Sequence, residues 1–233
     1  MPSEHSPVRE PSSRISNAVE TVQGYLIAPA IHDESFIATI GASSYFAMST
    51  VHARNLAAGW WHNRSTGERL ERNFGEICML IVSEVCEAAD GYYENLSDDK
   101  LPKRQMLEVE LADALIRILD TAGGFCPGDF PPQVASAVTS REGREARWDE
   151  WVWSATLTHR LLRVVMSIRD AMEAHRRGRD FAEHLATATV RILEIGIAEK
   201  LDLCGALADK LDYNAIRADH TLAARNAPGG KQY

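Results

Sequence analysis

Apolar residues recur every three or four positions along most of this chain, which is the spacing of one face of a helix. No stretch keeps the alternation of apolar and polar residues that indicates a half-buried strand. The pattern therefore predicts an all-α protein, built as a helical bundle. The helical pattern begins near residue 15, breaks at 28–30, and continues over about 35–61, 74–94, 104–122, 148–175, 180–197 and 203–220.

Polar and proline-rich stretches between these runs predict where the chain turns. Asn73, followed three residues later by Glu76, has the arrangement of a capping box and predicts a helix start. The sequence CPGDFPPQ at 126–133 predicts a break in regular structure. The resulting division is a flexible tail rich in Pro, Ser and charge (1–14), a helical unit (15–125), a linker (126–147), a second helical unit (148–220) and a basic tail (221–233).

Composition narrows the classes of function. A net charge of −8 without a basic stripe argues against a general nucleic-acid-binding surface. The first residues lack the apolar segment of a signal peptide, and no apolar run approaches the length that spans a membrane. The four cysteines have neither metal-binding nor redox spacing and are expected to be reduced. We therefore expect a cytoplasmic protein without a membrane or nucleic-acid partner.

Two predicted helices carry carboxylates among apolar neighbours. SEVCEAADGYY at 83–93 places Glu84 and Glu87 three residues apart, and LEVELADALIRILD at 107–120 places Glu110 and Asp113 three residues apart. Arg117 and Asp120 continue the second stripe, at seven and ten positions after Glu110. If the helices pack antiparallel across the SDDKLP turn at 97–102, the four carboxylates face one another.

Four unneutralised carboxylates at such distances require a cation. Each close pair would repel by about 4 kcal/mol at an effective dielectric constant near 20. Oxygen ligands without His or Cys favour Mg²⁺, or alternatively Mn²⁺. A di-iron bundle would need Glu-x-x-His pairs, which these helices lack. The alternative is that both stripes are solvated and that Arg117 pairs with one carboxylate.

The spacing of these carboxylates resembles a known family. EVCE at 84–87, a gap of 22 residues and ELAD at 110–113 look like the metal signature of the all-α nucleoside triphosphate pyrophosphatases, the MazG-like and dimeric-dUTPase-like superfamily. NLAAGWW at 55–61 with GEICMLIVSE at 75–84 is similar to the family's nucleoside-enclosing segments. KLDYNAIRADH at 210–220 with GGK at 229–231 is similar to its basic tail, although the eight residues TLAARNAP separate two pieces that are expected to be nearly adjacent.

The resemblance implies hydrolysis of a nucleoside triphosphate to a monophosphate and pyrophosphate, in nucleotide-pool sanitation or control of dNTP and dUTP levels. Glu84, Glu87, Glu110 and Asp113 would hold Mg²⁺, and one of them, which the sequence does not identify, would orient or deprotonate the attacking water. Two alternatives stay open. One is a non-catalytic nucleotide-binding or regulatory protein, and the other is a phosphohydrolase of a different metabolite that contains pyrophosphate.

Candidate substrate-binding residues lie outside the carboxylate helices. Lys210, Asn214 and Arg217 share one helix face, as a phosphate clamp requires, although the same stripe suits a solvated helix. Lys231 is a further candidate phosphate ligand by resemblance. The candidates for base or sugar contact are Asn55, Trp60 and Trp61, and the alternative is that the tryptophans belong to the core.

The second unit resembles a degenerate copy of the first. VRILE at 190–194 repeats IRILD at 116–120 with matching apolar positions. In this register the four metal candidates are replaced by Ser167, Asp170, His184 and Thr187. The pattern predicts two tandem helix pairs packed as a pseudo-dimer with one active site, either as a monomer or as a homodimer. Helical periodicity alone is the alternative explanation for the likeness.

Overall fold

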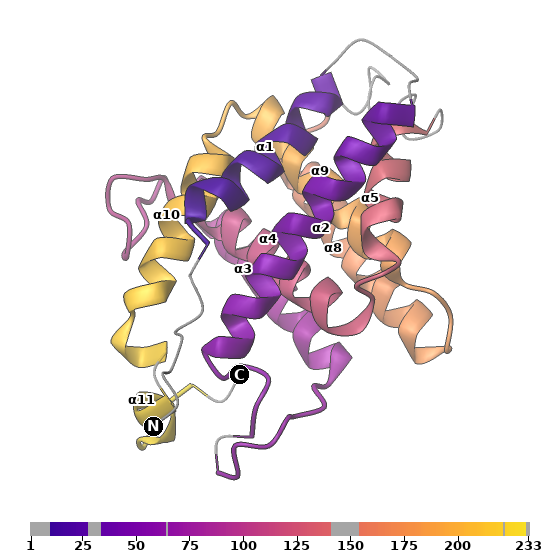
Figure 1. Ribbon diagram of the computed structural model, residues 1–233. Coiled ribbons are helices and arrows are strands. Elements are labelled where there is room, and N and C mark those ends of the chain that lie inside the picture. The colour runs from indigo at the N-terminus through magenta and orange to yellow at the C-terminus, as the bar shows by residue number, and fades with distance from the viewer. Residues whose placement is uncertain (1–9, 28–33, 64, 141–153, 221, 232–233) are drawn as a thin grey trace.

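Helices account for the regular structure of the computed structural model, which describes residues 10–27, 34–63, 65–140, 154–220 and 222–231 (Figure 1). The described residues contain two isolated β-bridges and no strand, so the predicted all-α class is confirmed. The helices are α1 (Ser12–Ile27), α2 (Glu34–Ala57), α3 (Phe74–Tyr93), α4 (Met106–Phe125), α5 (Phe130–Thr139), α8 (Leu157–Arg176), α9 (Ala182–Ala198), α10 (Leu203–Ile216), the 3₁₀ turn η1 (Ala218–His220) and α11 (Leu222–Asn226).

Side-chain caps define several helix starts. The Asn73 side chain accepts a hydrogen bond from the Glu76 amide at 3.0 Å, which confirms the predicted start of α3. Thr156 and Asp202 cap α8 and α10 in the same way. The start of α1 is earlier than expected, because Ser12 is buried and its hydroxyl donates to Asp212. The predicted tail therefore ends before Ser12, and its residues 1–9 lie outside the described part of the chain.

The segment expected to be a linker contains a helix. Helix α5 begins directly after Asp129 and has prolines in its first turn, where an amide hydrogen has no helical acceptor. The predicted break at 126–133 is therefore wrong from Phe130 onward. Phe130, Val134 and Val138 are buried, and α5 packs against α2 and α9. Residues 141–147 of the expected linker lie outside the described part of the chain.

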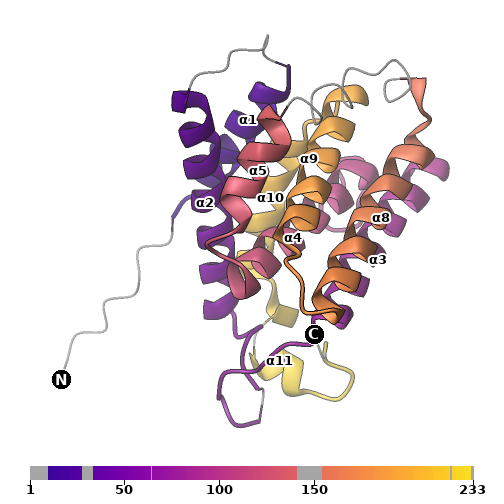
Figure 2. The ribbon, with the colours of Figure 1, turned by 90° about the vertical axis from the view of Figure 1, so that its right-hand side faces the viewer.

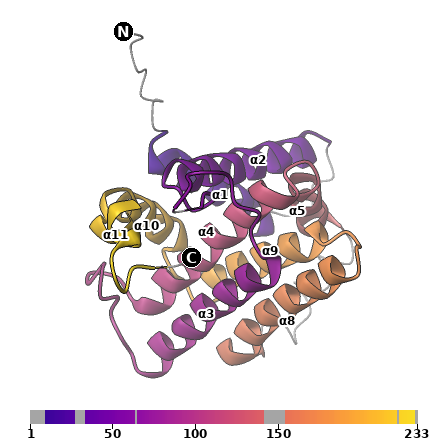
Figure 3. The ribbon, with the colours of Figure 1, turned by 90° about the horizontal axis from the view of Figure 1, so that it is seen from below.

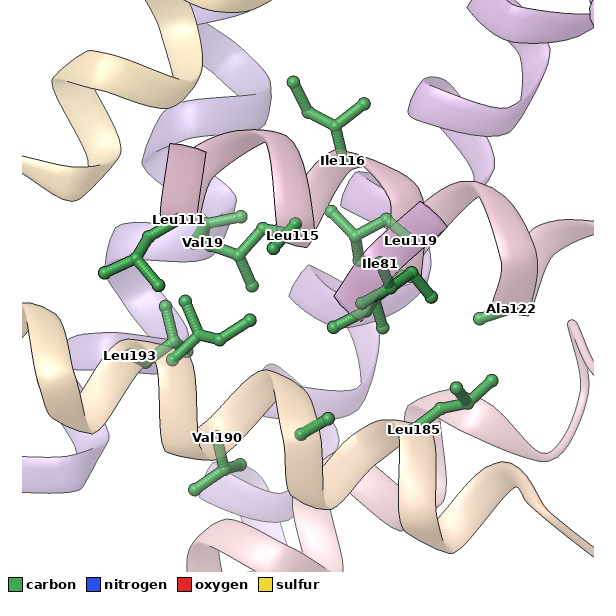
Figure 4. Packing of buried hydrophobic residues seen from close by; sticks show 14 of the residues in the cluster. Val19, Ile81, Leu111, Leu115, Ile116, Leu119, Ala122, Leu185, Val190 and Leu193 are labelled. Carbon is green, nitrogen blue, oxygen red and sulfur yellow. The ribbon is translucent and has the colours of Figure 1, made fainter. Parts of the chain in front are cut away.

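Helix α4 lies in the middle of the bundle, with α2, α3, α9 and α10 around it (Figure 3). Thirteen of its 20 residues are buried, and this explains why its sequence is apolar on nearly every side. Leu111 and Leu119 point toward α9, whereas Ile116 points to the opposite side of the helix (Figure 4). One continuous hydrophobic cluster joins helices from both predicted units. None of the described helices has the length and apolar character needed to cross a membrane.

The two helix pairs α3/α4 and α8/α9 bury equivalent positions. Every buried residue of α8 stands 83 positions after a buried residue of α3. With one exception, Ala182, every buried residue of α9 stands 74 positions after a buried residue of α4. The pairs also share a contact, because Arg117 reaches Glu84 in the first pair and Arg191 reaches Ser167 in the second. The same two offsets align the units in sequence, where Ser167 matches Glu84 and VRILE at 190–194 matches IRILD at 116–120.

Close packing at the end of α4 predicts that Gly124→Ala destabilises the protein. A Cβ atom at this position would lie 2.1 Å from Cη2 of the buried Trp61. We expect the free energy of unfolding to fall by about 1–3 kcal/mol, the usual effect of overpacking a core. Urea unfolding followed by circular dichroism measures the change.

The matched control is Gly41→Ala in α2, where a Cβ atom would meet no atom within 4 Å. This variant should be neutral or more stable by up to about 1 kcal/mol, because alanine favours helices over glycine. Equal unfolding free energies for the two variants would contradict the tight contact between α4 and Trp61.

Candidate active site

Three carboxylates converge where α3 and α4 pack side by side. Glu84, Glu87 and Glu110 each offer one carboxylate oxygen, and these oxygens all lie within 4.8 Å of one another. Glu84 and Glu110 are buried, whereas Glu87 is exposed. Asp113 lies one turn farther along α4, and its Oδ2 lies 2.7 Å from Nζ of Lys210. The structure therefore brings together three of the predicted ligands and places the fourth beside them, in an ion pair.

Burial and mutual repulsion disfavour the ionised form of these acids. Burial raises the pKa of Glu110 to about 9, and two other contacts act in the same direction, namely the Asp113 charge and a hydrogen bond in which protonated Glu110 donates to Glu84. Burial also raises the pKa of Asp113 to about 6, although the Lys210 ammonium opposes the shift. In the metal-free site, Glu110 therefore retains its proton near neutral pH. A divalent cation would allow all of these acids to ionise.

Two cations from the chain neutralise part of the cluster. Arg117 donates through Nε to Oε1 of Glu84 at 2.5 Å, as the solvated-stripe interpretation expects for one carboxylate. Lys210 has only 5% of its side chain exposed and pairs with Asp113. Among the described residues, no ion pair reaches Glu87 or Glu110. The remaining carboxyl oxygens fit a hard divalent cation, because they are close together, have no cationic partner and would be ionised when such a cation binds.

A cavity of about 360 Å³ opens in front of the cluster. Its walls include every predicted site residue except Trp61, namely Asn55, Trp60, Glu84, Glu87, Glu110, Asp113, Lys210, Asn214, Arg217 and Lys231. Trp61 is only 3% exposed and packs in the core, so the alternative interpretation holds for this residue. Lys210, Asn214 and Arg217 all line the cavity, and the side chains of Lys210 and Arg217 are largely buried, so the stripe is not simply solvated.

The sequence interpretation missed several residues that line the cavity. Arg117 and Asp120 already lay on the polar stripe of α4, so the helical spacing could have identified them. Arg72, Asp99 and Lys100 belong to the polar segments before α3 and between α3 and α4. Nothing in their spacing distinguishes them from ordinary loop residues. Their position at the cavity follows only from the packing of the helices that these segments connect.

The end of the cavity near Asp120 is built around that carboxylate. Oδ1 of Asp120 accepts a hydrogen bond from Nε1 of Trp61 at 2.9 Å, and Nδ1 of His52 lies 2.7 Å from the same oxygen. His52 and Trp61 reach it because glycines stand beside them in α4, where a Cβ atom would collide with either ring. The guanidinium of Arg72 lies 5.6 Å from the centre of the Trp61 ring.

The C-terminal segment covers the same end of the bundle as the segment before α3. Figures 1 and 2 show α11 beside residues 58–63 at this end. Arg225 is 2% exposed and donates to the Gly59 carbonyl at 3.0 Å, and its guanidinium lies 3.9 Å from the centre of the Trp60 ring. Arg225 thus packs behind Trp60, which lines the cavity. Lys231 follows it and lies 3.7 Å from Asp219.

No protein-family model matches the chain, and comparisons with curated protein sequences and with solved structures find no match either.

The raised pKa of Glu110 predicts that the metal-free protein loses stability as pH rises. The folded state retains the proton on Glu110 until the pH approaches its pKa of about 9. The unfolded chain releases this proton near pH 4.5, the ordinary pKa of a glutamate. The contribution of this group to stability is therefore fully present below pH 4.5 and is lost as pH rises toward 9. Because one pKa unit corresponds to about 1.4 kcal/mol, the loss should exceed about 1 kcal/mol.

Urea unfolding in EDTA at several pH values between 5 and 9 tests this expectation. Glu110→Gln should flatten the profile, because glutamine is neutral throughout. The control Glu71→Gln changes an exposed glutamate outside the cavity and should follow the wild-type profile. A wild-type profile as flat as that of Glu110→Gln would show that Glu110 is ionised in the folded protein.

Proposed function

We propose that this protein is a Mg²⁺-dependent nucleoside triphosphate pyrophosphohydrolase of the all-α type, which converts a (d)NTP and water to a (d)NMP and pyrophosphate. The observation that carries the proposal is one cavity that combines convergent carboxylates, several cationic side chains and an indole ring. Carboxylates bind the metal ions that accompany phosphate groups, and cationic side chains bind the phosphate groups themselves. An indole ring offers a surface on which a nucleobase can stack. Such an enzyme would serve nucleotide-pool sanitation or the control of dNTP and dUTP levels.

Glu84, Glu87, Glu110 and Asp113 would hold the Mg²⁺, with Mn²⁺ as an alternative. When bound, the cation would neutralise charge on the phosphate oxygens and favour the ionised form of water. Lys210, Arg217 and Lys231 supply donors to phosphate oxygens from one side of the cavity. Arg217 and Lys231 lie near Asp219, and this carboxylate would have to share them with the substrate.

Asn214 has a buried side-chain oxygen, Oδ1, that accepts no hydrogen bond from any described residue. An unpaired buried acceptor is unfavourable, by roughly 1–3 kcal/mol. Asn214 lines the cavity one helical turn from Lys210, so a ligand hydroxyl or an ordered water would satisfy it there. This supports a role for Asn214 in substrate binding rather than in packing.

The helix pair α8/α9 completes the bundle in our proposal as a degenerate copy of α3/α4. Within the described residues, the only group of three or more potential metal ligands is that of Glu84, Glu87 and Glu110. Helix α8 packs against α3, and α9 packs against α4, so the second pair covers the first. This arrangement favours a pseudo-dimeric monomer with one active site over a homodimer that needs a second chain to cover the pair.

A non-catalytic nucleotide-binding or regulatory protein is the second candidate. The ion pairs Arg117–Glu84 and Lys210–Asp113 favour it, because they neutralise two of the four carboxylates without a metal ion. A phosphohydrolase of another metabolite that contains pyrophosphate would use the same cluster. It would differ from the leading proposal only in what the rest of the cavity accepts.

The proposal predicts Mg²⁺-dependent release of pyrophosphate from at least one nucleotide in a panel of ribo- and deoxyribonucleoside triphosphates. Glu87→Gln should lower kcat by at least about 100-fold, the scale on which one electrostatic contact to a transition state acts. The control Asp170→Asn changes an exposed carboxylate at the equivalent position of α8 and should leave kcat unchanged.

Three outcomes separate the candidates. Binding of a nucleotide without turnover would support the regulatory protein. Release of orthophosphate instead of pyrophosphate would contradict cleavage between the α and β phosphates. Turnover of another compound that contains pyrophosphate, with none of the nucleotides, would support the third candidate.

A further inference from the structure

Asp120 presents an unused hydrogen-bond acceptor to the cavity. Both of its side-chain contacts, from His52 and Trp61, reach the same oxygen, Oδ1. No described residue donates a hydrogen bond to Oδ2, although Asp120 is only 7% exposed and lines the cavity. Because Oδ1 is fixed by two buried rings, the carboxylate cannot turn freely to satisfy Oδ2. A ligand group at this position must therefore donate a hydrogen bond.

Arg72 presents the complementary donors beside it. It lines the cavity, and it forms no hydrogen bond or ion pair with a described residue. The other cavity-lining cations of the described chain each lie within ion-pair distance of a carboxylate, namely Arg117 with Glu84, Lys210 with Asp113, Lys100 with Asp99, and Arg217 and Lys231 with Asp219. Burial lowers the pKa of Arg72, and the nearby charge of Asp120 opposes that shift. A guanidinium remains protonated in proteins, so Arg72 can only donate.

The pair lies at the end of the cavity where a base would lie. Asp120 is seven residues beyond Asp113 on α4, which is about 10 Å along the helix axis. This separation is too large for a sugar hydroxyl that lies a few bonds from the α-phosphate. Trp60 lines the same cavity, and the guanidinium of Arg225 stacks against its ring.

We propose that Asp120 and Arg72 read the Watson–Crick edge of the base and select nucleotides in which an exocyclic amino group stands there beside an unprotonated ring nitrogen, namely those of cytosine or adenine. This inference rests on the proposed function. In these bases an amino donor stands beside a ring nitrogen that accepts, which matches an acceptor-only carboxylate beside a donor-only guanidinium. In uracil and hypoxanthine the same two positions carry a carbonyl oxygen and a ring N–H. In that register both contacts would be repulsive, because acceptor would face acceptor and donor would face donor.

The test compares two pairs of nucleotides that differ only in this amino-to-keto change, CTP with UTP and ATP with ITP. The measured quantity is kcat/KM for pyrophosphate release in the presence of Mg²⁺. We expect the amino member of at least one pair to be favoured by about 10-fold or more, because unpaired polar groups in a site discriminate strongly. Equal rates for both pairs, or a preference for the keto members, would overturn the base-edge assignment. The hydrolytic function would still stand.

Two variants test whether Asp120 and Arg72 cause the preference for the amino nucleotides. Asp120→Asn and Arg72→Gln each replace a group of fixed polarity with an amide that can donate or accept, so the preference should fall to within about threefold. A merely structural role of Asp120 would instead lower kcat/KM for both members of a pair equally. If Asp120→Asn fails to fold by circular dichroism, Arg72→Gln decides alone. Asp170→Asn, an exposed control on α8, should keep the wild-type ratio.

If none of the four nucleotides is hydrolysed, calorimetric titration of each with Mg²⁺ separates the two proposals. A preference for CTP or ATP over its keto partner that is lost in Asp120→Asn would support the base-edge assignment and contradict hydrolysis. Binding without such a preference, or no binding at all, would overturn the assignment as well.

Discussion

Burial of like charges on α3 and α4 is the constraint on which the rest of this structure depends. Glu84 and Glu110 are buried beside Asp113 and Glu87, and at such distances their repulsion exceeds what surface ion pairs compensate. The chain meets this constraint in part with Arg117 and Lys210, which pair with Glu84 and Asp113. Burial, together with the repulsion that these two pairs leave uncompensated, raises the pKa of Glu110. A cation that bound to this cluster from solution would stabilise the folded protein.

Helix α4 can carry this cluster only because its other sides are surrounded by apolar helices. Leu111 and Leu119 pack toward α9, while Ile116 on the opposite side forms part of the cavity wall together with the carboxylates (Figure 4). At its end, the paired glycines 123 and 124 let His52 and Trp61 approach closely enough to hold Asp120. The same helix thus carries both the acidic cluster and Asp120, and its regular geometry sets the distance between them.

Helical spacing was sufficient to predict most of the helices and many of the residues that line the cavity. The carboxylates, and likewise Lys210, Asn214 and Arg217, recur at intervals of three, four and seven residues. Such intervals place side chains on one face of a helix whatever the neighbouring helices do. Helix α5 was missed because its prolines, read as breakers, occupy a first turn that tolerates them. Arg72, Asp99 and Lys100 were missed because loop residues have no period, and only tertiary packing brings them to the cavity. Trp61 was misplaced for a similar reason, since spacing cannot distinguish the cavity face of a tryptophan pair from the core face.

The second helix pair shows what the same architecture does without the acidic cluster. Arg191 occupies the position of Arg117, but Ser167 stands where Glu84 would be, so the arginine donates to a hydroxyl and to the Arg163 carbonyl. Burial lowers the pKa of Arg191 to about 10, and the Arg163 charge contributes. Arg191 thus donates to neutral partners where Arg117 donates to a carboxylate. Equivalent positions therefore form a structural contact in both helix pairs, but only α3 and α4 carry an excess of negative charge. For this reason we place the proposed metal site on α3 and α4 and propose that α8 and α9 support it by packing.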